Sequence, residues 1–284
     1  MDQRTDPLYQ KDGQLHTHTT TITSIHPLSS LPQETQALFK IPPPEEEQGP
    51  PYILTTPSTI FHAQGGGQPS DTGTIKSTSE VNNGDGDPNT FHVHQVRKVN
   101  TAILHAGTFS PPQAATPFSS NASSEHVRQD IDVAARLLHS RLHTAGHVIG
   151  LAIHLLATAP SNPPGGGLIP PDIVDGKASH YPGAAFVECH GLIPGTAKAA
   201  IQAKVDELVN ADLAVGIHFW SEERARGSVW GCGELKGMRW MGLGLWRLVV
   251  VEEGKVDVIR VGDACEEVGE CGKVVVRGLR GRRG

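Results

Sequence analysis

The long amphipathic stretch that follows Asp130 constrains the fold more than any other feature of the sequence. It extends from Ile131 to Leu156 and ends before a segment rich in proline and glycine at 159–167. Apolar residues recur in it with the three- and four-residue spacing of one helical face. They occupy positions 134, 137, 138, 142, 145, 148, 149 and 152. The pattern predicts a long helix that buries this face.

The chain before this helix has the pattern of a small β domain. Its strands are predicted from β-prone runs at 52–61, 74–75, 91–99 and 103–104. We expect this domain to span 51–107, and the Pro-, Ser- and Ala-rich residues 108–125 to form a linker. Residues 1–50 include a run of three prolines followed directly by three glutamates at 42–47, and we expect residues 1–50 to be a mobile polar segment.

The chain after the helix mixes both kinds of element. We expect a helix over about 197–210 and strands over about 184–188, 214–220, 245–251 and 256–261. Residues 252–254, Glu-Glu-Gly, are a hairpin signal between the last two strands. Residues 126–284 are therefore predicted to form a second domain, of the α+β class. At 284 residues the chain is long enough for two modest domains that each bury a core.

The composition narrows the classes of function. The formal net charge of −6 argues against a generic nucleic-acid binder. Residues 273–284 contain five basic residues and no acidic one, so they form either a local phosphate-contacting patch or a solvated tail. Because there is no signal peptide and no apolar run of about 18 residues, we expect a soluble, cytoplasmic protein without membrane contact. The four cysteines are then expected to be free thiols or metal ligands.

Two histidines on the predicted helix are candidate metal ligands. His143 and His147 stand four residues apart, so their imidazoles project from one helical face within reach of a single ion. Thr144 occupies the position that a general-base glutamate would need in a metalloprotease motif. His139 lies one turn earlier, and three stacked residues on a straight helix cannot all reach one ion. It is interpreted as a surface residue or a support for the ligands.

A third ligand must come from elsewhere in the chain. Cys271 lies on a turn marked by glycines, and its thiolate could complete a mixed His/Cys site, although a lone cysteine is more often an inert buried thiol. Cys265 is a possible substitute. The pair Cys189 and His190, not far from His180, is another candidate, but neighbouring residues on a strand point to opposite faces.

A glycine-rich loop lies between two predicted strands, from Gln64 to Gly73. Its glycines could let backbone amides approach an anion. They could equally form a tight turn at positive φ. No Lys-Ser/Thr pair follows the loop and no helix opens behind it, so it matches neither a Walker loop nor a dinucleotide fingerprint.

Together these segments resemble the alanyl-tRNA editing proteins and the editing domains of alanyl- and threonyl-tRNA synthetases. The string Gln64-Gly-Gly-Gly-Gln-Pro-Ser-Asp-Thr-Gly73 is similar to the family's glycine-rich motif, and His143-Thr-Ala-Gly-His147 to its His-x-x-x-His. Cys271-Gly-Lys-Val-Val275 is similar to its Cys-x-x-x-His, except that Val275 stands where the family has histidine. The resemblance covers about residues 50–107 and 126–276.

The resemblance implies an α+β fold, in which a small glycine-motif β-barrel domain precedes an editing domain with an antiparallel sheet and a metal-binding helix. It implies zinc bound by His143, His147 and Cys271, and hydrolysis of seryl- or glycyl-tRNA(Ala), so that tRNA is the expected partner. No catalytic residue is assigned beyond the metal site. The implied substrate-binding residues are Gln64, Gly65, Gly66, Gly67, Gln68 and Asp71. The alternative is a non-catalytic relative that binds tRNA or metal, and a nucleotide-binding module built on the glycine loop is a more distant one.

Overall fold

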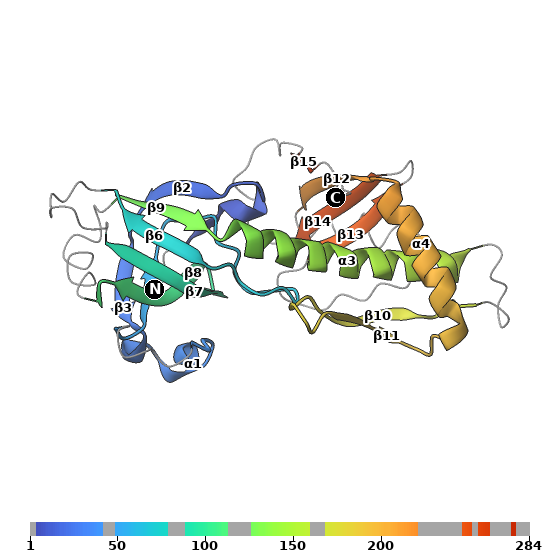
Figure 1. The fold of residues 1–284 in the computed structure, drawn as a ribbon, viewed down its shortest axis with the longest axis horizontal. Coiled ribbons are helices and arrows are strands. Elements are labelled where there is room, and N and C mark those ends of the chain that lie inside the picture. The colour runs from blue at the N-terminus through green and yellow to red at the C-terminus, as the bar shows by residue number, and fades with distance from the viewer. Residues whose placement is uncertain are drawn as a thin grey trace. The chain divides into compact units, whose positions relative to one another are not determined.

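The computed structural model describes residues 4–41, 49–78, 89–112, 126–159, 168–220, 246–251, 255–261 and 274–276. The chain divides into two units, residues 1–140 and 141–284. Both contain helices and strands, so the predicted α+β class is confirmed (Figure 1). None of the described helices is long and apolar enough to cross a membrane.

A curled antiparallel sheet forms the first unit (Figure 1). The seven described strands lie in the order β2-β9-β6-β7-β8-β4-β3, and each neighbouring pair is antiparallel. The strands are β2 (Thr17–Thr21), β3 (Ser24–Pro27), β4 (Tyr52–Thr55), β6 (Gly73–Ser77), β7 (Thr90–Val99), β8 (Ala102–Ser110) and β9 (His126–Ile131). The described strands leave β2 and β3 as edges, so the sheet is a half-barrel where a barrel was expected.

Strand β8 shows why both faces of this sheet bury apolar side chains. All its residues except Ser110 are buried. Ile103 packs on one face with Leu54, Phe61 and Phe91, whereas Leu104 packs on the other with Leu31 and Phe39. Successive side chains of a strand point to opposite faces, so a continuous apolar run fits a strand covered on both sides.

Residues before 50 take part in the fold, although they were expected to be mobile. β2 pairs with β9, and β3 pairs with β4. Short elements also lie here: β1 (Asp6–Pro7), which pairs with β5 (Ser58–Thr59), and η1 (Leu8–Gln10), η2 (Leu28–Ser30) and α1 (Gln33–Gln36). Leu31 and Phe39 from this stretch reach the core. Residues 42–48, which hold the prolines and glutamates, lie outside the described residues.

Strand β9 also departs from the expected organisation. Its residues were expected to open the second domain, yet they pair with β2 and β6 inside the first sheet. The fully buried Gln129 fixes this position, because its amide accepts a hydrogen bond from Ile60 N and donates to Thr56 Oγ1 and the Ser58 carbonyl. Residues 113–125, most of the expected linker, lie outside the described part of the chain.

The predicted long helix is α3 (Val133–Thr158), and residues on both sides of the unit boundary contribute to it. Asp132 caps it by accepting a hydrogen bond from the amide of Ala135 at 3.0 Å. The predicted buried face is wrong in the first half, where positions 134, 137, 138 and 145 are exposed. The first turns instead bury Arg136, and Ala152, Ile153 and Ala157 are buried further along.

In the described residues of the second unit, α3 is followed by a hairpin, a helix and a small sheet. Strands β10 (Val174–Ser179) and β11 (Phe186–His190) form the antiparallel hairpin, and η4 (Gly195–Ala197) leads into α4 (Lys198–Asn210). The sheet has the order β13-β14-β12-β15, from β12 (Ala214–Trp220), β13 (Trp246–Val251), β14 (Lys255–Val261) and β15 (Val274–Val276). It is mixed where an antiparallel sheet was expected, because β12 runs parallel to β14.

Candidate functional site

The glycine loop forms a tight turn between β5 and β6. Gly65 and Gln68 exchange both backbone hydrogen bonds, at 3.0 and 3.2 Å. The two residues between them, Gly66 and Gly67, have φ of 56° and 79°. Positive φ at both central positions defines a type I′ turn, which glycine adopts without steric cost. The alternative interpretation of this loop as a tight turn is therefore confirmed.

Asp71, in the same motif, is part of a buried ion pair. Its side chain is fully buried and that of Arg136 is 6% exposed. Arg136 Nε lies 2.9 Å from both carboxylate oxygens, and its Nη2 donates to Oδ2 as well. The amide of His62 also donates to Oδ2, at 2.6 Å. Arg136 donates further to the carbonyls of Ile60 and Gly13. The pair joins the glycine motif to the first turns of α3.

The residues predicted to bind substrate thus differ in their exposure to solvent. Asp71 and Gln68 are buried, whereas Gly65 and Gly66 are exposed at the tip of the turn. Gln64 is half-buried, and its side-chain oxygen accepts a hydrogen bond from Gln95 at 3.1 Å. A substrate-binding role for the motif stays a prediction, and the buried pair gives Asp71 a structural role.

His143 and His147 lie together on α3 in the second unit, as their spacing predicts. Both are half-buried, and their ring centroids are 4.9 Å apart with the planes inclined by 22°. The rings are therefore stacked one helical turn apart.

A third imidazole, which the sequence analysis did not group with these two, joins the cluster. His180 follows β10 directly and is 3% exposed. Its ring centroid lies 4.4 Å from that of His143, with an interplanar angle of 19°, and 6.2 Å from that of His147. Burial lowers the pKa of His180, and a hydrogen bond to the backbone of Leu142 opposes this shift. His180 is thus held against α3 by burial and by this hydrogen bond.

Gly146 provides the space for His180. A Cβ atom built at this position would lie 2.9 Å from Nδ1 of His180 and closer still to its Cε1. It would also contact Val187 of β11 at 3.5 Å. The hairpin therefore approaches α3 at the residue of the motif that has no side chain.

The imidazole side chains of this cluster are a chemical type that binds zinc, but the described residues do not supply enough ligands for a complete site. Neutral imidazole is a common zinc ligand. Among the described residues, however, no three His, Cys, Asp or Glu side chains lie together in a way that could hold an ion. Cys271 and its possible substitute Cys265 lie outside the described residues. Val275 lies in β15, where it is paired with Gly216.

The other candidate residues are not brought into this cluster. Cys189 is half-buried and packs against the apolar cluster around Ile153, whereas its neighbour His190 is exposed. The two therefore face opposite sides of β11, as expected.

His139 belongs to the first unit, and its buried Nδ1 has no hydrogen-bond partner among the described residues. Burial lowers its pKa.

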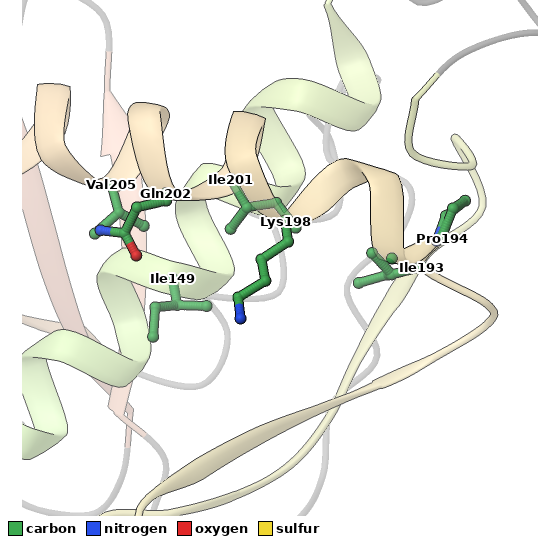
Figure 2. Close-up of a pocket in the computed structure, with 8 residues that line it drawn as sticks. Ile149, Ile193, Pro194, Lys198, Ile201, Gln202 and Val205 are labelled. Carbon is green, nitrogen blue, oxygen red and sulfur yellow. The ribbon is translucent and has the colours of Figure 1, made fainter.

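A separate cavity of about 330 Å³ lies between α3 and α4 (Figure 2). Its only residue from α3 is Ile149, which is roughly 200° around the helix from His147. None of the residues that line it belongs to the histidine cluster. It is lined by Ile149, Ile193, Pro194, Gly195, Lys198, Ile201, Gln202 and Val205.

Comparison with known proteins gives a partial relationship. No protein-family model matches the chain. An alanine–tRNA ligase of Haloquadratum walsbyi is 30% identical over 106 residues, which are 37% of this chain and 9% of the ligase. One from Natronomonas pharaonis is 33% identical over 101 residues, which are 36% of this chain and 9% of the ligase. A segment of this chain is similar in sequence to alanine–tRNA ligases. The related segment corresponds to a small part of much longer proteins.

Proposed function

We propose that the protein is a trans-editing hydrolase that removes serine or glycine from mischarged tRNA(Ala). The observation that carries the proposal is the cluster of His143 and His147 on α3, buttressed by His180, in a chain with a ligase-related segment. The two motifs that resemble editing proteins lie in one chain and in the family's order. Editing is the reaction on aminoacyl-tRNA that this combination favours.

In this proposal His143, His147 and Cys271 would hold a zinc ion. A zinc ion with an open coordination position would supply a Lewis acid that polarises the ester carbonyl or lowers the pKa of bound water. The chain's own residues supply the geometry. α3 sets the spacing of the two imidazoles, and the hairpin places the buried ring of His180 against them.

Selectivity for serine over alanine has a physical basis in such a site. Serine differs from alanine by one hydroxyl group. A site that hydrogen-bonds this hydroxyl leaves a buried polar group unpaired when alanine enters, which can reject alanine strongly. Correctly charged alanyl-tRNA(Ala) would then be spared.

The test is a deacylation assay with purified protein on seryl-, glycyl- and alanyl-tRNA(Ala). We expect release of serine or glycine, little release of alanine, and loss of activity in His147→Ala. Thr144→Ala is the matched control, because Thr144 is exposed on the same helix between the two histidines. Release no faster than without protein on both mischarged tRNAs would refute the hydrolase. Retained tRNA binding in that case would favour the non-catalytic relative.

A further inference from the structure

We propose that His180 is a positioning residue that sets the ring plane of His143, and that Gly146 is the gap in α3 that admits it. The proposal deepens the proposed function, because it rests on His143 and His147 as the zinc-binding pair. It assigns a role to two residues that are neither predicted ligands nor part of the glycine motif.

The stacking geometry carries the first step. The backbone does not fix the plane of a histidine ring, because rotation about χ2 is broad and roughly two-fold. A neighbouring ring stacked on its face restricts that rotation. His180 stacks on His143 with a centroid separation of 4.4 Å and an interplanar angle of 19°. Since the nitrogen lone pairs lie in the ring plane, fixing the plane of His143 also fixes the direction in which its nitrogen can coordinate an ion.

His180 is itself held firmly enough to serve as this support. Its side chain is 3% exposed, and its ring is hydrogen-bonded to the backbone of Leu142, the residue before His143. The bond and the stacking contact involve the same turn of α3. His180 contacts His143 through its face, and the three rings do not form a group that could hold an ion. It is therefore a support for the pair and not a third ligand.

Gly146 carries the second step. A glycine inside a helix is less favourable for helix stability than alanine, so its presence there indicates a steric or packing requirement. Here the reason is steric, because a Cβ would collide with Cε1 of His180 and lie 2.9 Å from its Nδ1. The glycine of the string His143-Thr-Ala-Gly-His147 thus lets a residue more than 30 positions later reach the pair.

Metal affinity tests the proposal. Zinc binding is measured by competition with a chelator in wild-type protein, His180→Ala, His180→Phe and Gly146→Ala, with circular dichroism to confirm folding. Loss of a group that orients a ligand typically lowers metal affinity about 10- to 100-fold. We expect such a loss in His180→Ala and Gly146→Ala, and recovery of most of it in His180→Phe, which keeps an aromatic face.

Gly195→Ala is the matched control, because a Cβ at Gly195 meets nothing within 4 Å. It should bind zinc as the wild type does. Wild-type affinity in both His180→Ala and Gly146→Ala would overturn the proposal. If His180→Ala fails to fold, Gly146→Ala decides, because its Cβ would displace the ring of His180, and wild-type zinc affinity in that variant would overturn the proposal.

A metal-free measurement separates this proposal from the proposed function. In protein with isotope-labelled histidine, the ring-current effect of His180 should shift the ring-proton signals of His143. His180→Ala should remove that shift, and Gly195→Ala should not. If the wild type bound no zinc but this shift were present, the zinc hydrolase would be refuted and the positioning contact would stand. Absence of the shift would refute the positioning contact.

Discussion

Two polar clusters lie along α3, one around Arg136 in the first unit and one around His143 in the second. The guanidinium of Arg136 has its partners within the fold, namely the Asp71 carboxylate and two backbone carbonyls. The histidine cluster is held by ring stacking and by the hydrogen bond from His180 to the backbone. A charge whose partners all lie inside the fold serves stability, whereas half-buried imidazoles retain the chemistry of a ligand. This difference separates the first turns of α3, which the ion pair joins to the glycine motif, from the turn that carries the candidate ligands His143 and His147.

The largest expected effect is on the ion pair. Arg136→Met leaves the fully buried Asp71 carboxylate without its cation, and breaking such a pair costs about 3–5 kcal/mol of unfolding free energy. Urea unfolding followed by circular dichroism measures the loss. The double variant Arg136→Met with Asp71→Leu should recover part of it, because it removes both charges.

Arg128→Met is the control for this prediction. Arg128 pairs with Asp130 at the surface, where such pairs contribute about 1 kcal/mol or less. An Arg136→Met protein as stable as Arg128→Met would contradict the structural role of the buried pair. Asp71 would then be available again as a substrate-binding residue.

A second prediction concerns His105, a histidine that, like Arg136, has its hydrogen-bond partners inside the fold. It is fully buried, with Nδ1 2.9 Å from the Leu54 carbonyl and Nε2 2.8 Å from Thr59 Oγ1. Nδ1 therefore donates to the carbonyl, and Nε2 accepts from the hydroxyl. Burial lowers the pKa of His105 from 6.5 to about 4.

The sign of the pH effect follows from this shift. Between pH 6.5 and about 4, His105 binds a proton in the unfolded chain but not in the folded protein. The contribution of His105 to the free energy of unfolding is therefore fully present above pH 6.5 and is lost as the pH falls through this window. The loss attributable to His105 is about 3 kcal/mol across the window. His105→Gln should flatten the pH dependence of urea unfolding there, whereas His92→Gln, at an exposed position of β7, should not. An unchanged slope in His105→Gln would contradict the assignment.

A structural feature could be predicted from the sequence where it depends on neighbouring residues, and could not where it depends on contacts between distant segments. The predicted helix over 197–210 and strand over 214–220 agree with α4 and β12, because each is specified by its own residues. β2 and β9 were not identified as neighbours, since they are joined by pairing between Thr17–Thr21 and residues more than 100 positions later. β2 is also rich in threonine and lacks the apolar alternation of a half-buried strand.

The residues of the candidate site were likewise predicted where neighbouring residues specify them, and missed where contacts between distant residues do. The pairing of His143 and His147 can be read from a spacing of four residues. Arg136 was not recognised because arginine is rarely buried, and its partner lies 65 residues away. His180 could not be placed from the sequence, since its contact depends on how the hairpin packs on α3. The signal that could have found it is Gly146, a helix-interior glycine with no other evident reason.

The smallest expected effect on stability, and the sharpest test of the comparison, is at the histidine pair. His143 and His147 are half-buried and uncharged in their proposed role, so replacing either by alanine should cost far less unfolding free energy than Arg136→Met. Zinc should nevertheless be lost, because an ion left with one imidazole and the thiolate of Cys271 has too few ligands. Cys271→Ser should weaken zinc binding as well, since a hydroxyl is a much poorer zinc ligand than a thiolate.

Elemental analysis of the purified variants measures their zinc content, with Thr144→Ala as the control on the exposed side of the helix. Should His143→Ala and His147→Ala keep the zinc content of the wild type, the pair would not be ligands, and the middle of α3 would join its first turns as part of the scaffold.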